Sequence, residues 1–179
     1  NTVRQYLGSL LPSRIHIGWL LFVLLFFALM VLASWGLGAL LGLDVEYPGL
    51  WGEPAGRVMP LFLLAYLMTA LATGGLEEPG WRGVMQPLMQ KTFSPLVAAM
   101  IVSLFWSLWH LPLFWNGFYP EDVVVGMLGG GVYRILLAVF MAWVYNRTKG
   151  NVFLMVLLHT SFNLMVDFIP TSDVVLLVL

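Results

Sequence analysis

The sequence has no cysteine and very little charge. Without cysteine there is no disulfide, no thiolate nucleophile and no cysteine-based metal site. Only 9% of the residues are charged, and eight Lys and Arg balance nine Asp and Glu to a formal net charge of −1. There is no basic stripe, so the sequence offers no surface for a nucleic acid.

What the chain has in abundance is apolar surface. Hydrophobic residues make up 60% of it, 15% are aromatic, and the mean hydropathy is +0.91, which is typical of membrane proteins. We therefore predict an all-α, multi-pass transmembrane helical bundle of about five to six spans, with a polar cavity inside the membrane. The apolar runs that predict these spans are residues 15–43, 58–76, 92–120, 123–145 and 151–169, and a sixth begins at 174.

At 179 residues the chain is predicted to form a single membrane-embedded domain, residues 1–179. The last apolar run, residues 174–179, is interpreted as the start of a helix that the sequence cuts short. The expected location is an integral, multi-pass position in a bacterial or archaeal cell membrane, with membrane lipids as partners.

Two acids and a base interrupt this apolar chain at Glu77, Glu78 and Arg82. Ionisable residues are costly in a membrane, so each is a candidate for function. The i,i+4 spacing and order of Glu78 and Arg82 favour an ion pair on a helix. Glu77 points about 100° away from Glu78 and is therefore the carboxylate left for chemistry. Pro79, with two glycines at 74–75, predicts a kink or a helix restart.

Two histidines and an asparagine lie inside later apolar runs. The i,i+4 spacing of His159 and Asn163 puts both on one helix face, and His110 lies on another predicted span. Together with Glu77 they form a set suited to hydrolysis. A carboxylate can take a proton from water, a neutral His can orient that water or protonate the leaving amine, and Asn with a second His can stabilise an oxyanion.

A further charge, Arg134, follows three glycines at 129–131. We favour structural pairing or snorkelling for this residue over contact with a substrate. The glycines are compatible with close helix packing and with a broken helix, and the sequence does not distinguish the two.

The polar motifs resemble those of the CPBP intramembrane proteases, which include the type II CAAX prenyl endopeptidases and the bacteriocin-processing, Abi-like proteins. The resemblance covers residues 76–163 and consists of Glu-Glu-Pro-Gly-Trp-Arg from Glu77, Leu-Trp-His ending at His110, and His159-x-x-x-Asn163. One departure is that the second motif usually reads Phe-x-x-x-His, whereas Trp106 stands four residues before His110.

The resemblance implies an intramembrane endopeptidase that cleaves a peptide or a membrane-tethered protein. Glu77 would be the base that activates water, with His110 sharing that task. His159 and Asn163 would form the oxyanion site. Glu78 and Arg82 would support Glu77.

Two mechanisms remain open for this residue set. A zinc site built from Glu77, His110 and His159 is chemically acceptable, and a metal-free glutamate/histidine mechanism uses the same residues. The alternative function is a non-catalytic membrane immunity or scaffold protein that retains the protease fold. An ion-coupled transporter is disfavoured by the small number of spans and the lack of internal repeats.

Overall fold

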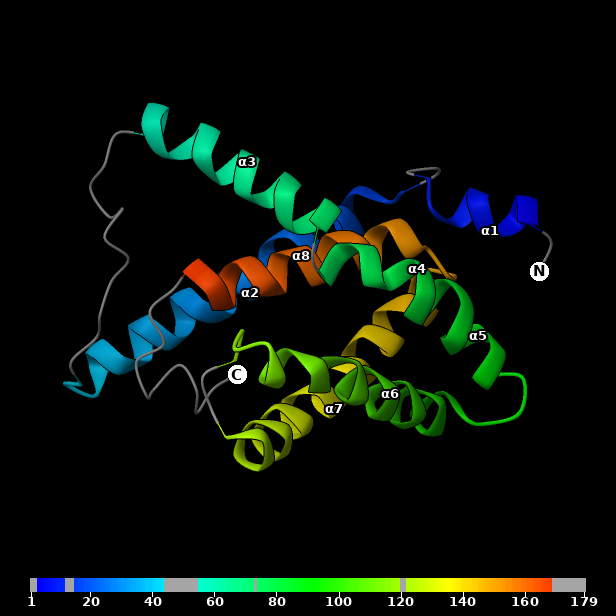
Figure 1. Cartoon of the computed structure of the whole chain (residues 1–179). Helices are drawn as coiled ribbons and strands as arrows, with labels where there is room; N and C mark the ends of the chain where they lie inside the picture. The colour runs from blue at the N-terminus through cyan, green and yellow to red at the C-terminus, as the bar shows by residue number, and fades with distance from the viewer. Residues whose placement is uncertain (1–2, 12–14, 44–54, 73, 120–121, 169–179) are drawn as a thin grey trace. The chain divides into compact units, whose positions relative to one another are not determined.

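The computed structural model describes residues 3–11, 15–43, 55–72, 74–119 and 122–168 (Figure 1). The regular elements among these residues are all helical, which confirms the all-α prediction. In chain order they are α1 (Val3–Ser9), α2 (Ile17–Leu40), α3 (Ala55–Ala72), the 3-10 turn η1 (Gly74–Glu77), α4 (Glu78–Gly80), the π-helical turn η2 (Trp81–Met85), α5 (Gln86–Met89), α6 (Pro95–Trp115), α7 (Val123–Arg147) and α8 (Val152–Phe168).

Four helical segments of the described chain are long and apolar enough to cross a membrane. They are Ile17–Leu40, Val58–Met89, Pro95–Trp115 and Val123–Arg147, and Val152–Met165 is a shorter apolar helix. These five segments correspond to the five long predicted runs. The last apolar run, residues 174–179, lies outside the described residues.

Local sequence signals set several of the helix ends. The His16 ring caps α2 by accepting a hydrogen bond from the Gly18 N–H at 3.1 Å. Ser94 caps α6, and Asp122 caps α7 by accepting from Val124 N–H at 2.9 Å. The short helix α1 was not predicted, because seven residues are too few for a clear apolar period.

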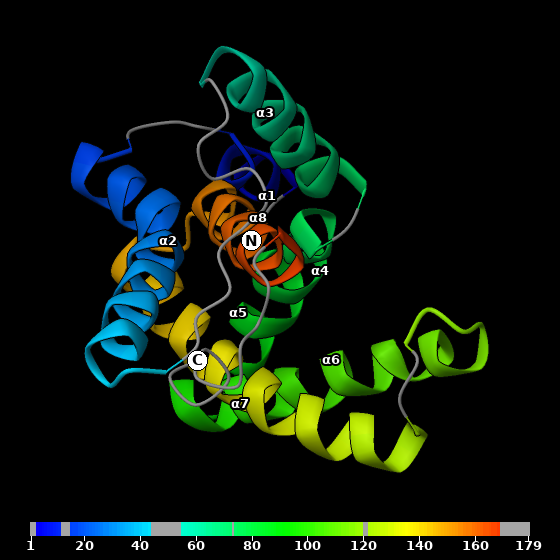
Figure 2. The same ribbon diagram turned by 90° about the vertical axis from the view of Figure 1, so that its left-hand side faces the viewer.

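The described chain divides into two compact units, each discontinuous in sequence. One comprises Asn1–Leu11 and Pro79–Val152, and the other comprises Pro12–Glu78 and Phe153–Leu179. In the first unit α6 and α7 run side by side as an antiparallel hairpin (Figures 1 and 2). Phe114 of α6 lies against Gly126 of α7, where a side chain at the glycine position would not fit.

In the second unit α2 lies alongside α8 (Figures 1 and 2). The rings of Phe27 and Phe162 meet at 5.2 Å between centroids, and Met165 packs on the buried pair Val31 and Trp35. Apolar residues of α8 thus pack on α2, although Phe162 and Met165 are only partly buried.

The chain changes helix type three times between Gly74 and Met89, where the sequence predicted a kink or restart. A Cβ at Gly75 would lie 2.5 Å from the Ala70 carbonyl oxygen, so only glycine fits where η1 follows α3. The π-helical turn at Trp81–Met85 then precedes α5, with the Gln86 N–H bonded to the Trp81 carbonyl. Such turns are frequent at functional sites.

Candidate functional site

The central feature of the site is a buried contact between Glu78 and His159. Glu78 Oε1 and His159 Nδ1 are 2.7 Å apart, and the two residues are 0% and 3% exposed. The contact joins residues 81 positions apart in sequence within one compact unit. Because the carboxylate occupies Nδ1, the chemistry of His159 is directed through Nε2.

A glycine creates the space that Nε2 faces. A Cβ at Gly74 would collide with His159 Nε2 and with Asn163 Nδ2. Both side-chain atoms therefore lie beside the same backbone position, as the predicted common face of α8 requires. The structure thus brings together Glu78, His159 and Asn163, and it adds Gly74 as the residue that makes room for them.

Polar contacts along α8 hold this face in place. The Tyr66 hydroxyl of α3 donates to the Leu157 carbonyl at 2.9 Å and lies 3.2 Å from Ser161 Oγ. Thr160 donates to the Val156 carbonyl at 2.7 Å. Sequence reasoning passed over Tyr66, although a hydroxyl within an apolar run is a detectable signal.

The other unit contains His110 and Arg82. His110 Nδ1 lies 2.7 Å from the Trp106 carbonyl oxygen, which can only accept, so Nδ1 carries the proton and the neutral ring presents a lone pair at Nε2. The Arg82 guanidinium lies 5.3 Å from the centre of the Trp106 ring, and Arg82 is fully buried. Trp106, noted as the departure from the family motif, therefore contacts both residues.

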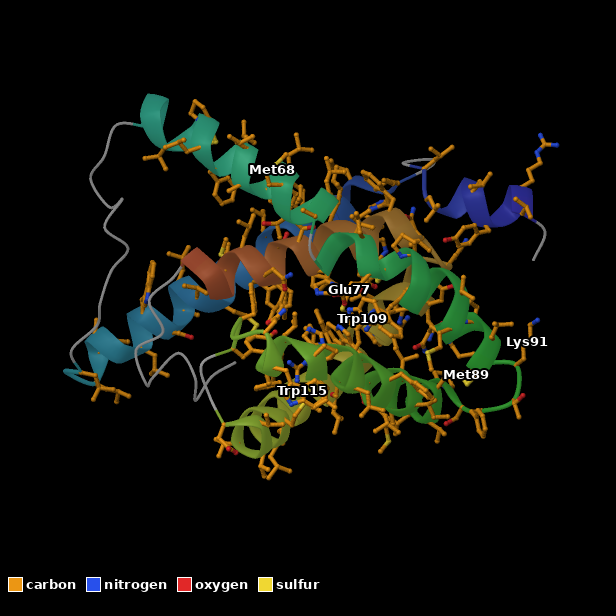
Figure 3. All side chains as sticks on the ribbon, in the orientation of Figure 1. Met68, Glu77, Met89, Lys91, Trp109 and Trp115 are labelled. Atoms are coloured by element: carbon orange, nitrogen blue, oxygen red, sulfur yellow. The ribbon has the colours of Figure 1, made fainter. Side chains whose placement is uncertain are left out.

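Glu77 ends η1 and is half-buried, directly before the buried Glu78 (Figure 3). The two carboxylates therefore differ in environment, as their predicted divergence requires. The predicted pair of Glu78 with Arg82 and the predicted cooperation of Glu77 with His110 each join residues of different compact units. Both stay predictions.

Neither unit, within its described residues, gathers three or more His, Cys, Asp or Glu side chains that could hold a metal ion. The predicted zinc ligands Glu77, His110 and His159 come from both units. The zinc site therefore stays a prediction.

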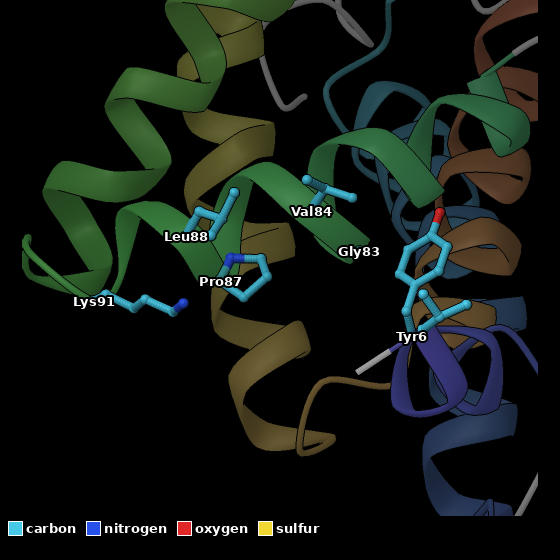
Figure 4. Close-up of a pocket in the computed structure, with 7 residues that line it drawn as sticks. Tyr6, Gly83, Val84, Pro87, Leu88 and Lys91 are labelled. Carbon is cyan, nitrogen blue, oxygen red and sulfur yellow. The ribbon is translucent and has the colours of Figure 1, made fainter. Parts of the chain in front are cut away.

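A separate pocket of about 330 Å³ opens in the first unit beside α1 (Figure 4). The Tyr6 hydroxyl there lies 3.4 Å from the Pro79 carbonyl, and a Cβ at Gly83 would press on the Tyr6 ring. Its lining is Val3, Tyr6, Gly83, Val84, Pro87, Leu88 and Lys91. The pocket is built from mostly apolar side chains, and its lining includes none of the predicted site residues.

One buried polar residue near the motif was missed from sequence. Gln86 is 0% exposed, and neither of its amide atoms has a hydrogen-bond partner in the described part of the chain. It lies four residues after Arg82, which is the only hint that the sequence contains.

Apolar helices long enough to span a membrane, together with a carboxylate–histidine pair buried in one compact unit, are the features of a polytopic membrane protein with buried polar groups. The sequence model described as Type II CAAX prenyl endopeptidase Rce1-like matches residues 59–165, which is more than half of the chain. The chain belongs to this family. The match includes every residue predicted for the site, from Glu77 to Asn163.

A curated relative is similar over part of its length. The protein named CAAX prenyl protease 2 from Methanococcus maripaludis is 27% identical over 124 residues, which is 66% of this chain and 44% of the relative. The chain thus matches less than half of the length of that relative. The name describes the relative, and its activity bears on this chain only as a hypothesis.

Proposed function

We propose that this chain is an intramembrane endopeptidase that hydrolyses a peptide bond in a membrane-associated peptide or protein. The observation that supports this most is the buried contact between Glu78 and His159, with Asn163 beside the same space at Gly74, which we call the glycine notch. Burying a carboxylate and an imidazole beside the half-buried Asn163 is costly in an apolar protein, and a structural role alone does not require it. Family membership supports the same reaction class.

Glu77 is the proposed general base. It accepts a proton from water as the water oxygen attacks the carbonyl carbon of the scissile bond, and it later returns that proton to the leaving amine. His110 shares the task by accepting a hydrogen bond from the same water at Nε2, because its Nδ1 is bonded to the Trp106 carbonyl. The cooperation of the two residues rests on their chemistry and on family membership.

His159 and Asn163 are the proposed hydrogen-bond donors to the oxyanion. This role requires a particular protonation state of the His159 ring. Nε2 of His159 can donate only when it carries a hydrogen. That holds if the imidazolium faces an ionised Glu78, or if a protonated Glu78 donates to Nδ1. Either way Glu78 decides whether Nε2 is a donor, and it acts as a positioning residue for His159.

The histidines also have the chemistry of zinc ligands. Metal-bound histidines usually bond their second ring nitrogen to a carboxylate or a backbone carbonyl, and His159 and His110 do so to Glu78 and Trp106. In the zinc form, Glu77, His110 and His159 would hold the ion. Bound zinc would supply Lewis-acid activation of water.

The test is cleavage of a farnesylated C-a-a-X peptide by purified protein in detergent, followed by mass spectrometry. Glu77→Gln and His110→Ala are each expected to abolish product, since each removes a group that handles the attacking water. Glu53→Gln and His16→Ala lie outside the matched region, 59–165, and are the matched controls.

Retained cleavage in Glu77→Gln or in His110→Ala would refute the mechanism. Equal biological activity of the wild type and Glu77→Gln would instead favour the immunity or scaffold role. Metal analysis of the active protein, with activity measured before and after chelation, separates the zinc form from the metal-free form.

A further inference from the structure

The fourth long helix, α7, contains a buried guanidinium that the proposed chemistry does not use. Arg134 is 2% exposed, and its Nε and Nη1 atoms have no hydrogen-bond partner in the described part of the chain. The guanidinium carbon lies 5.1 Å from the centre of the Tyr133 ring. The structural pairing favoured from sequence does not involve these two atoms within the described residues, and a side chain this buried does not fit snorkelling.

A glycine provides the space that this side chain occupies. A Cβ at Gly130 would lie 2.6 Å from Arg134 Nη1, whereas nothing lies within 4 Å of a Cβ at Gly129 or Gly131. Of the three glycines, only Gly130 therefore leaves space for the Arg134 side chain. Helix α7 continues unbroken through the three glycines, so they do not break it.

The hairpin register brings the guanidinium near a proposed catalytic residue. Phe114 of α6 lies against Gly126 of α7, and Gly130 and Arg134 follow at successive i+4 steps on the same face of α7. Two antiparallel helices advance equally, by about 1.5 Å per residue. Gly130 therefore lies at about the same height along the hairpin axis as His110. The Arg134 guanidinium reaches the same height, because its Nη1 lies beside Gly130.

We propose that Arg134 binds the C-terminal carboxylate of the substrate peptide. The Nε–H and Nη1–H groups are charged donors without a partner in the described part of the chain, and a carboxylate accepts charge-assisted hydrogen bonds from such donors. Substrates of the C-a-a-X type end in a short, uncharged tail with a free carboxylate, which is the anion that must accompany that tail into an apolar site. This proposal rests on the proposed endopeptidase function.

An anionic lipid headgroup fits the position less well. Arg134 lies near the middle of the 25-residue helix α7, roughly 16 to 20 Å along the axis from either end. A headgroup lies at the membrane surface, about 15 Å from the centre of the hydrocarbon core. A buried mid-helix guanidinium does not reach it, whereas the end of a peptide drawn into the protein does.

The experiment uses two fluorescent farnesylated peptides that are identical except for a C-terminal carboxylate or a C-terminal amide. Binding to the full chain is measured by fluorescence anisotropy in zwitterionic detergent, in the Glu77→Gln background so that no turnover interferes. The acid is expected to bind about tenfold or more tightly than the amide, as charge-assisted hydrogen bonds imply.

Two substitutions should remove this preference by different routes. Arg134→Gln removes the charge, and Gly130→Ala keeps it but displaces Nη1, at no cost in helix propensity. The controls are Arg147→Gln, an exposed arginine of the same helix, and Gly129→Ala, where the added methyl meets nothing. Both controls should keep the full preference.

Equal binding of the two peptides to the parent protein, or a preserved preference in Arg134→Gln, overturns the proposal. The proposal is also overturned if phosphatidylglycerol displaces both peptides equally from the parent protein but not from Arg134→Gln. Arg134 would then bind a lipid headgroup. A clear acid preference with no cleavage by the wild-type chain leaves the carboxylate site standing and refutes the endopeptidase. Cleavage of both peptides without any preference for the acid supports the endopeptidase and refutes the carboxylate site.

Discussion

At the scale of single residues, the two adjacent glutamates lie in different environments. Glu78 is fully buried and bound to His159, while Glu77 is half-buried at the end of a 3-10 turn. Spacing alone assigned Glu78 to Arg82, four residues later, because i,i+4 neighbours are the only partners that a sequence displays. A partner 81 residues away leaves no local pattern.

Replacement of Glu78 by Gln tests its role as a positioning residue for His159. We expect kcat to fall by about 10- to 100-fold, as for other carboxylates that orient a functional histidine, with little change in KM. Nitrogen NMR of labelled histidine should show a changed Nδ1 and Nε2 protonation pattern at one imidazole only. A raised KM with an unchanged kcat and an unchanged histidine spectrum would contradict this role.

At the scale of elements, η1 lies against α8 because both Gly74 and Gly75 lack side chains. Gly75 allows the turn to fold onto Ala70, and Gly74 leaves room for His159 and Asn163. The sequence analysis took these glycines as the mark of a kink. The contacts of Gly74 show that the 3-10 turn η1 also leaves the space for the polar face of α8.

Gly74→Ala should therefore damage the site. The added methyl forces the imidazole and the amide aside, and we expect the free energy of unfolding to fall by about 1–3 kcal/mol, with a larger loss of peptide cleavage. Thermal unfolding in detergent and the cleavage assay measure the two effects. Gly80→Ala is the control, because nothing lies within 4 Å of a methyl there. A Gly74→Ala protein as stable and active as Gly80→Ala would show that the notch is unimportant.

At the scale of the whole molecule, apolar side chains remain exposed along the long helices. Leu61, Leu63 and Leu64 of α3 are 62%, 59% and 54% exposed, which water-soluble proteins do not tolerate over a continuous surface. Four segments of the described chain have the length and composition to span a bilayer. These surfaces are suited to lipid.

The expressed protein should accordingly remain in the membrane pellet after washing with alkaline carbonate, and detergent should release it. The apolar helices bury their outer faces in the hydrocarbon core, so removing peripheral electrostatic contacts changes nothing. Immunoblotting of the pellet and the supernatant measures the outcome. Recovery of intact protein in the carbonate supernatant would show that the helices do not span the bilayer.

The sequence by itself determined the helical class, the positions of the long helices and the residues of the polar motifs, because apolar runs and helical spacing are local properties of the chain. His159 and Asn163 could be assigned to one face for the same reason. The tertiary structure decided which carboxylate contacts His159, which glycine makes room for it, and that Arg134 is buried with unused hydrogen-bond donors. Those facts depend on segments far apart in sequence packing together, and no local period encodes them.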